Sequence, residues 1–168
     1  WASGAYAQYG RTLLREIMKL WAAAPVAALI TFRFADSITH FIYGGSRFQL
    51  EDLANTAAAL RMFSLGILFW TAQVLLARGS YAAQMTWLPS LLGGLCSLIA
   101  IPLYAWLSQS MGFQGLALAG SIAIAAYSSL LWAILVLHLR KRCPEVAVGP
   151  FYIFCVAWLG VLAGLWFV

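Results

Sequence analysis

Charged side chains are scarce in this chain of 168 residues. Asp, Glu, Lys and Arg together make up 9% of it, whereas 64% of the residues are apolar. Soluble domains usually carry about 25% charged residues. Residues 79–139 form a run of 61 consecutive positions without any of the four charged types. A soluble fold would need charged groups on the surface of such a segment, so the composition predicts a membrane protein.

Groups that perform chemistry are also few. The sequence holds only five carboxylates, and it contains no HExxH motif, no Ser/His/Asp set and no phosphate-binding glycine loop. Cys96, Cys143 and Cys155 lack the spacing of metal ligands and cannot all pair. We therefore expect a protein that is not an enzyme, with no catalytic residue, no metal site and no cofactor.

The net charge of +5 does not indicate nucleic-acid binding. A phosphate-binding surface needs clustered basic residues on a polar face, and a chain this apolar offers no such face. The chain begins with Trp1 and ends with Val168 inside an apolar run, which we interpret as a piece of a longer protein.

Five apolar stretches are long enough to cross the hydrocarbon core, which requires about 20 residues per helix. They do not alternate as barrel strands do. We therefore predict an all-α, polytopic transmembrane helical bundle of about five spans. The predicted spans cover residues 20–43, 57–77, 87–107, 116–139 and 151–168, with the third interrupted by Pro102.

Basic residues indicate the direction of these spans, since Lys and Arg accumulate in cytoplasmic loops. One side receives seven of them, and the other receives Arg47 and Arg61 together with Glu51 and Asp52. The seven are Arg11, Arg15, Lys19, Arg78, Arg140, Lys141 and Arg142. The chain is thus predicted to enter from the cytoplasm, and its short connections predict antiparallel neighbours. We assign Glu51 and Asp52 to the positive end of a helix dipole.

Three ionisable residues lie within the first span. Arg33, Asp36 and His40 are spaced three and four apart, which places them on one face of a continuous helix. Such groups usually face a bundle interior or a watery cavity. One interpretation is a substrate-binding or cavity-lining stripe that contacts an anion or responds to protons. The other is an internal Arg33–Asp36 pair, with Asp36 and His40 reaching the outer interface.

Small and hydroxyl-bearing residues recur within the spans. Their usual role in bilayers is close helix packing, and lining of a transport path is the alternative. Gly160 and Gly164 form a GxxxG packing motif in the last span.

Three ordered segments carry a resemblance to a known family. Leu76–Pro89 resembles the L-A-x-x-F-Y-A-x-x-D-T-x-T-P segment of the MurJ/MviN lipid II flippases, and Gly112–Ala119 resembles the family's G-x-x-G-L-A-L-A. Upstream, residues 42–66 resemble the family's F-x-x-G-x-F, E-D and A-L-x-x-Y-x-L-G stretches. The matching positions in the first two segments are Tyr81, Ala82, Thr86, Pro89, Gly112, Gly115 and Leu116.

The resemblance implies a multi-pass transporter of the MOP superfamily in the bacterial inner membrane. Residues 1–142 would belong to its second, C-terminal lobe, and residues 143–168 to a further, truncated span. The implied function is movement of lipid II, a lipid-linked anionic glycan precursor for peptidoglycan and the cell wall, to the outer leaflet by alternating access.

Three departures keep other functions open. Met85 replaces an Asp common in the family, Ser80 replaces a Phe, and Gly or Ser stands in the span 87–107 where Asn is common. A flippase for undecaprenyl-linked polysaccharide of the O-antigen type, or a non-transporting scaffold, therefore remains an alternative.

Overall fold

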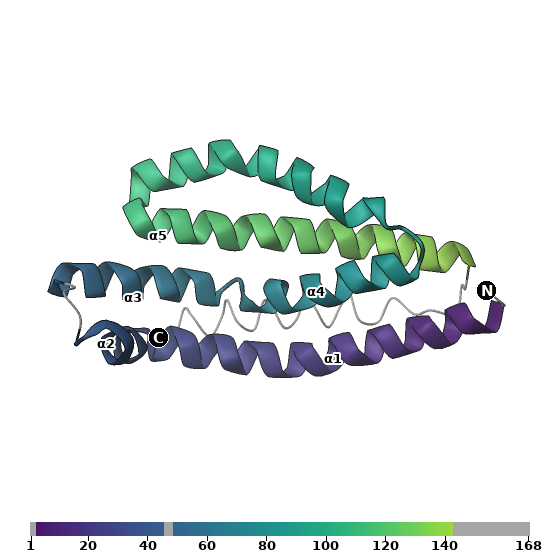
Figure 1. Ribbon diagram of the computed structural model, residues 1–168, viewed down its shortest axis with the longest axis horizontal. Coiled ribbons are helices and arrows are strands. Elements are labelled where there is room, and N and C mark those ends of the chain that lie inside the picture. The colour runs from purple at the N-terminus through teal and green to yellow at the C-terminus, as the bar shows by residue number, and fades with distance from the viewer. Residues whose placement is uncertain (1–2, 46–48, 143–168) are drawn as a thin grey trace.

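All described elements of the protein are helices. The computed structural model describes residues 3–45 and 49–142. It contains α1 (Ser3–Arg33), α2 (Ala35–Tyr43), α3 (Leu50–Ser64), α4 (Ile67–Ala82) and α5 (Trp87–Arg142), shown in Figure 1. The predicted all-α class is confirmed. The predicted span 151–168 and its GxxxG motif lie outside the described residues.

Helix α5 is a helical hairpin that turns at Gly112. This residue has φ 60° and ψ −134°, a non-helical conformation that divides the element into arms 87–111 and 113–142. The arms run side by side in opposite directions (Figure 1). They correspond to the predicted spans 87–107 and 116–139. The predicted interruption at Pro102 is wrong, because the first arm continues through this residue.

The predicted span 20–43 is not one helix. Helix α1 begins much earlier and ends at Arg33, and α2 is bent by 67° relative to it. The bend occurs at Phe34, with φ −103° and ψ 15°. Helix α2 packs mainly against α3 and buries Ala35 and Thr39. The change of direction at Phe34 thus brings α2 into contact with α3. Hydropathy along the chain does not report such contacts.

A second bend, of 50°, separates α3 from α4 at Leu65 and Gly66. The Gly66 N–H donates to the Phe63 carbonyl at 2.9 Å. This bond spans three residues, whereas a regular α-helical bond spans four. The Met62 carbonyl instead accepts a 2.8 Å hydrogen bond from the Ser121 hydroxyl of α5. A buried hydroxyl therefore satisfies a backbone group at the break.

Length and composition are compatible with membrane crossing. Within the described residues, the segment Trp87–Leu139 is long and apolar enough by itself. The pairs α1–α2 and α3–α4 meet the same criterion only when each bent pair is taken as one span.

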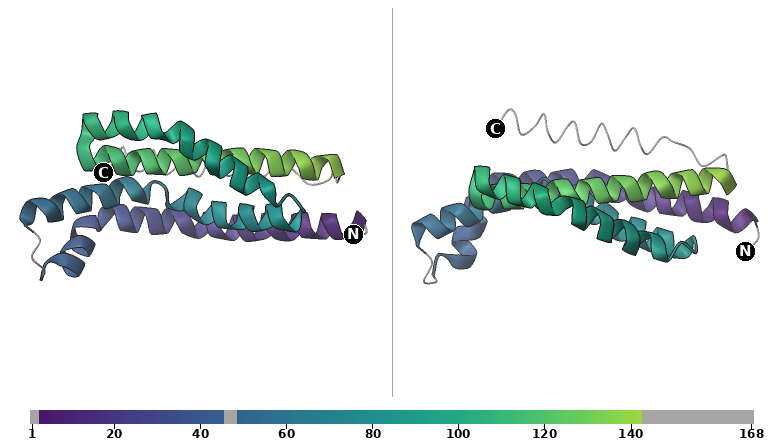
Figure 2. Two further views of the ribbon diagram at one scale, coloured as in Figure 1. Left: turned by 45° about the horizontal axis from the view of Figure 1, so that its top comes forward. Right: turned by 90° about the horizontal axis from the view of Figure 1, so that it is seen from above.

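The bundle is antiparallel, as the short connections predicted. The start of α1 and the ends of α4 and α5 lie at one end, whereas α2, the start of α3 and the α5 turn lie at the other (Figures 1 and 2). The main core joins α1, α4 and the second arm of α5, with Ile17, Leu76, Leu131 and Leu135 fully buried. This arrangement leaves the first arm of α5 and helix α2 at the periphery.

Candidate functional site

The three ionisable residues of the first predicted span come from two helices. Arg33 is the last residue of α1, whereas Asp36 and His40 belong to α2. The bend at Phe34 separates them, so the predicted single helical face is wrong. The three side chains remain near one another in sequence, at the junction of a broken span.

Asp36 forms its ion pair with Arg61 of α3, through Oδ2 and Nη2. The predicted pair between Arg33 and Asp36 is therefore wrong. Arg61 is 25 residues away in sequence, and no spacing pattern pointed to it. Both side chains are partly exposed, at 64% for Asp36 and 35% for Arg61. The pair fastens α2 to α3.

Arg33 is exposed and forms no ion pair or hydrogen bond with another side chain of the described segments. Beside the bend, Asp36, Ser37, His40 and Phe41 line an open hollow of about 480 Å³. Arg33 itself is not among the residues that line this hollow. An exposed guanidinium at a helix break is chemically suited to contact an anionic head group.

Glu51 and Asp52 lie in the first turn of α3, as expected for carboxylates at the positive end of a helix dipole. The Gln49 backbone N–H donates to Asp52 Oδ2 at 3.2 Å. This is the reciprocal half of a capping box. The structural interpretation of these two residues is confirmed.

The first family segment forms the tight connection between α4 and α5. Ala82 ends α4, and Gln84 adopts a positive φ of 62°. The Met85 N–H bonds the Ser80 carbonyl at 2.9 Å. Pro89 is buried, and its carbonyl accepts a 3.1 Å hydrogen bond from the Tyr127 hydroxyl. Tyr81 and Thr86 are exposed.

The second family segment forms the opposite hairpin turn. Gly112 holds the positive φ, and Gly115 permits the two arms to touch, since a Cβ there would lie 1.9 Å from the Leu107 carbonyl oxygen. Leu116 is exposed. The turn geometry therefore explains why glycine occupies both positions: Gly112 has a positive φ, and Gly115 has no room for a Cβ.

The hydroxyl residues of the spans mainly bond to the backbone. The Ser128 hydroxyl donates to the Phe69 carbonyl at 3.1 Å, just as the Ser121 hydroxyl donates to the Met62 carbonyl. Within residues 3–45 and 49–142 no group of three His, Cys, Asp or Glu residues could hold a metal ion. Cys96 is a free thiol.

Comparison with known proteins agrees with the sequence motifs. The family described as lipid II flippase MurJ matches residues 6–165. A curated relative from Bdellovibrio bacteriovorus, named probable lipid II flippase MurJ, is 26% identical over 149 residues. The alignment covers 89% of this chain but 28% of that relative. No solved structure matches the chain. Because the family match extends over nearly the whole sequence, this chain belongs to the lipid II flippase MurJ family.

Proposed function

We propose that the protein containing this chain moves lipid II from the cytoplasmic to the outer leaflet of a bacterial inner membrane by alternating access. The observation that carries the proposal is the family match over residues 6–165. The apolar helices and the two bent helix pairs support it. Broken helices are common in transporters, where they bring polar groups to membrane depth.

Arg33 is the residue that we assign to the anionic part of the substrate. A lipid-linked precursor carries a pyrophosphate, and a guanidinium presents donors that match phosphate oxygens. Asp36 already neutralises Arg61, so Arg33 is the cation at this bend without a carboxylate partner in the described segments. His40 lines a hollow together with Asp36, which Arg61 holds, and the imidazole would contact the polar head group there.

Complementation of cells depleted of their lipid II flippase tests the function. The full-length protein, expressed at a normal level, is expected to restore precursor translocation and growth. Failure to restore either one would contradict the proposal. Rescue of a surface polysaccharide defect alone would identify the O-antigen type of substrate, and rescue of neither would indicate a scaffold.

Substitution of Arg33 tests the site. We expect Arg33→Ala to lower translocation at least about tenfold, since a hydrogen bond to a charged group contributes about 1.5–3 kcal/mol and about 1.4 kcal/mol is a factor of ten. Arg33→Lys should retain part of the activity. Arg15→Ala is the matched control, because Arg15 is an exposed arginine of the same helix, far from the bend. Equal activity of the two alanine variants would contradict the assignment of Arg33 to the substrate site.

A further inference from the structure

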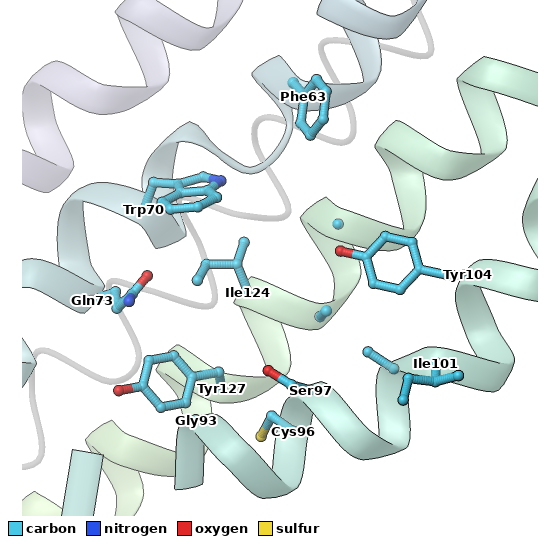
Figure 3. A pocket seen from close by; sticks show the side chains of 13 residues that line it. Phe63, Trp70, Gln73, Gly93, Cys96, Ser97, Ile101, Tyr104, Ile124 and Tyr127 are labelled. Atoms are coloured by element: carbon cyan, nitrogen blue, oxygen red, sulfur yellow. The ribbon is translucent and has the colours of Figure 1, made fainter. Parts of the chain in front are cut away.

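A second cavity lies away from the charged bend, between α4, the end of α3 and the two arms of α5. Its volume is about 380 Å³, within the usual size range of small-molecule sites. Figure 3 shows the side chains that surround it. The residues that the argument uses are Trp70 and Gln73 of α4, Gly93, Ser97 and Tyr104 of the first α5 arm, and Ala123 of the second.

The cavity is elongated. Its lining on the first arm extends from Gly93 to Tyr104, which corresponds to about 16 Å of helix at 1.5 Å per residue. Trp70 and Ser97 are exposed at its margin, so the cavity opens to the surface of the described segments. A groove of this length has room for a chain-like molecule.

None of the described residues that line the cavity is charged. Aromatic side chains and small residues form most of it, and small residues leave room where larger ones would fill the space. A charged ligand would lie here without a counter-charge, which is unfavourable in an apolar environment. The pyrophosphate of a lipid-linked precursor is therefore unsuited to this cavity.

One polar group in the lining has no hydrogen-bond partner among the residues that the structure describes. The Gln73 Oε1 atom is buried there without a donor, and Figure 3 shows it directed toward the cavity. Buried acceptors are nearly always satisfied in native proteins. The Ser97 and Tyr104 hydroxyls also face the cavity (Figure 3), whereas the Tyr127 hydroxyl is already bonded to Pro89. The cavity thus offers an acceptor and two uncommitted hydroxyls.

We propose that this cavity binds an uncharged amphiphile, with its aliphatic chain along the groove and a hydroxyl donating to Gln73 Oε1. The apolar, aromatic walls hold the chain, and the neutral polar groups select the head. The site does not depend on the proposed function, because it shares no residue with the bend at Arg33.

Photolabelling of the full-length protein in nanodiscs tests the site. The probe is a diazirine-bearing hexadecanol, compared with the fatty acid and the alkane of the same chain length. We expect the alcohol to label peptides that line the cavity at least about fivefold more than either comparator.

Two variants and a control sharpen the test. Gln73→Leu removes the acceptor at similar size and is expected to lower labelling by the alcohol about fivefold, with no change for the alkane. Gly93→Leu fills the groove, since only Tyr127 approaches a Cβ there, at 3.8 Å, and should abolish labelling by all probes. Gln109→Leu, on an exposed position of α5 outside the cavity, should change nothing.

Two results would overturn the proposal. Equal labelling by alcohol, acid and alkane, unaffected by Gln73→Leu, would show a groove that accepts any chain. Absence of labelling, together with protection of Cys96 from a membrane-permeable maleimide, would show that another part of the full-length polypeptide covers the cavity.

Discussion

At the residue scale, three glycines decide how closely the backbones approach. A Cβ at Gly66 would lie 2.9 Å from the Ser121 hydroxyl oxygen, and one at Gly115 would overlap the Leu107 carbonyl. Gly112 has a positive φ that favours glycine. Two of these positions, Gly112 and Gly115, belong to the motif that identified the family. That motif therefore encodes the geometry of a hairpin turn.

Substitution of Gly115 follows from this geometry. We expect Gly115→Ala to lower the free energy of unfolding by about 1–3 kcal/mol, as is typical of overpacking. The measurement is thermal unfolding of the full-length protein in detergent. Gly94→Ala is the control, since nothing lies within 4 Å of a Cβ at Gly94; a helical Gly→Ala change there should be neutral or slightly stabilising. Equal effects would contradict the role of close approach.

At the element scale, the two bends distinguish this bundle from a set of straight spans. Each bend is accompanied by a contact from another helix: Arg61 of α3 pairs with Asp36 beside the first, and Ser121 of α5 donates to the Met62 carbonyl beside the second. Neither bend lies at a proline, and both α1 and α5 continue through an internal proline, Pro25 and Pro102. A tertiary contact accompanies each bend, and a glycine, Gly66, lies at the second.

Charge reversal tests the contact between α2 and α3. Asp36→Arg and Arg61→Asp should each impair transport, because each places like charges at the same contact. The double variant should restore at least half of the activity. A partly exposed pair contributes only about 0.2–1 kcal/mol to stability, so the transport assay is the informative measurement.

The same reversal at Glu16 and Lys19, an exposed pair 2.8 Å apart within α1, serves as the control and should have little effect. A double Asp36/Arg61 variant as impaired as the two single variants combined would show that their pairing does not matter.

At the scale of the whole molecule, the bundle has two chemically different ends. Basic residues predicted to be cytoplasmic occur at the start of α1 and the ends of α4 and α5, which lie together (Figure 1). The opposite end carries α2, the carboxylates of α3 and the uncharged α5 turn. The basic residues predicted to be cytoplasmic are thus gathered at one end of the folded bundle.

Cysteine labelling tests the orientation. In a cysteine-free background, we expect Gln109→Cys to react with a membrane-impermeant maleimide added outside intact spheroplasts. Lys141→Cys should react only after permeabilisation. Both positions are exposed, so a difference in reactivity reports the side of the membrane on which each position lies. The reverse pattern would contradict the predicted direction of the chain.

The sequence by itself determined the class of fold, the antiparallel order and the family. Hydropathy, charge and motif spacing are local properties, and each can be read over about 20 residues. They located the α5 hairpin closely because its turn contains no charge and carries the Gly112–Gly115 motif.

Only the tertiary structure decided where the spans bend, which residue pairs with Asp36 and where a cavity forms. The Asp36–Arg61 contact joins positions 25 residues apart, and the Ser121–Met62 contact joins positions 59 apart. The cavity needs residues of α4 and of both arms of α5 at once. Periodicity places side chains on one helix, whereas bends, ion pairs and cavities depend on how several helices pack together.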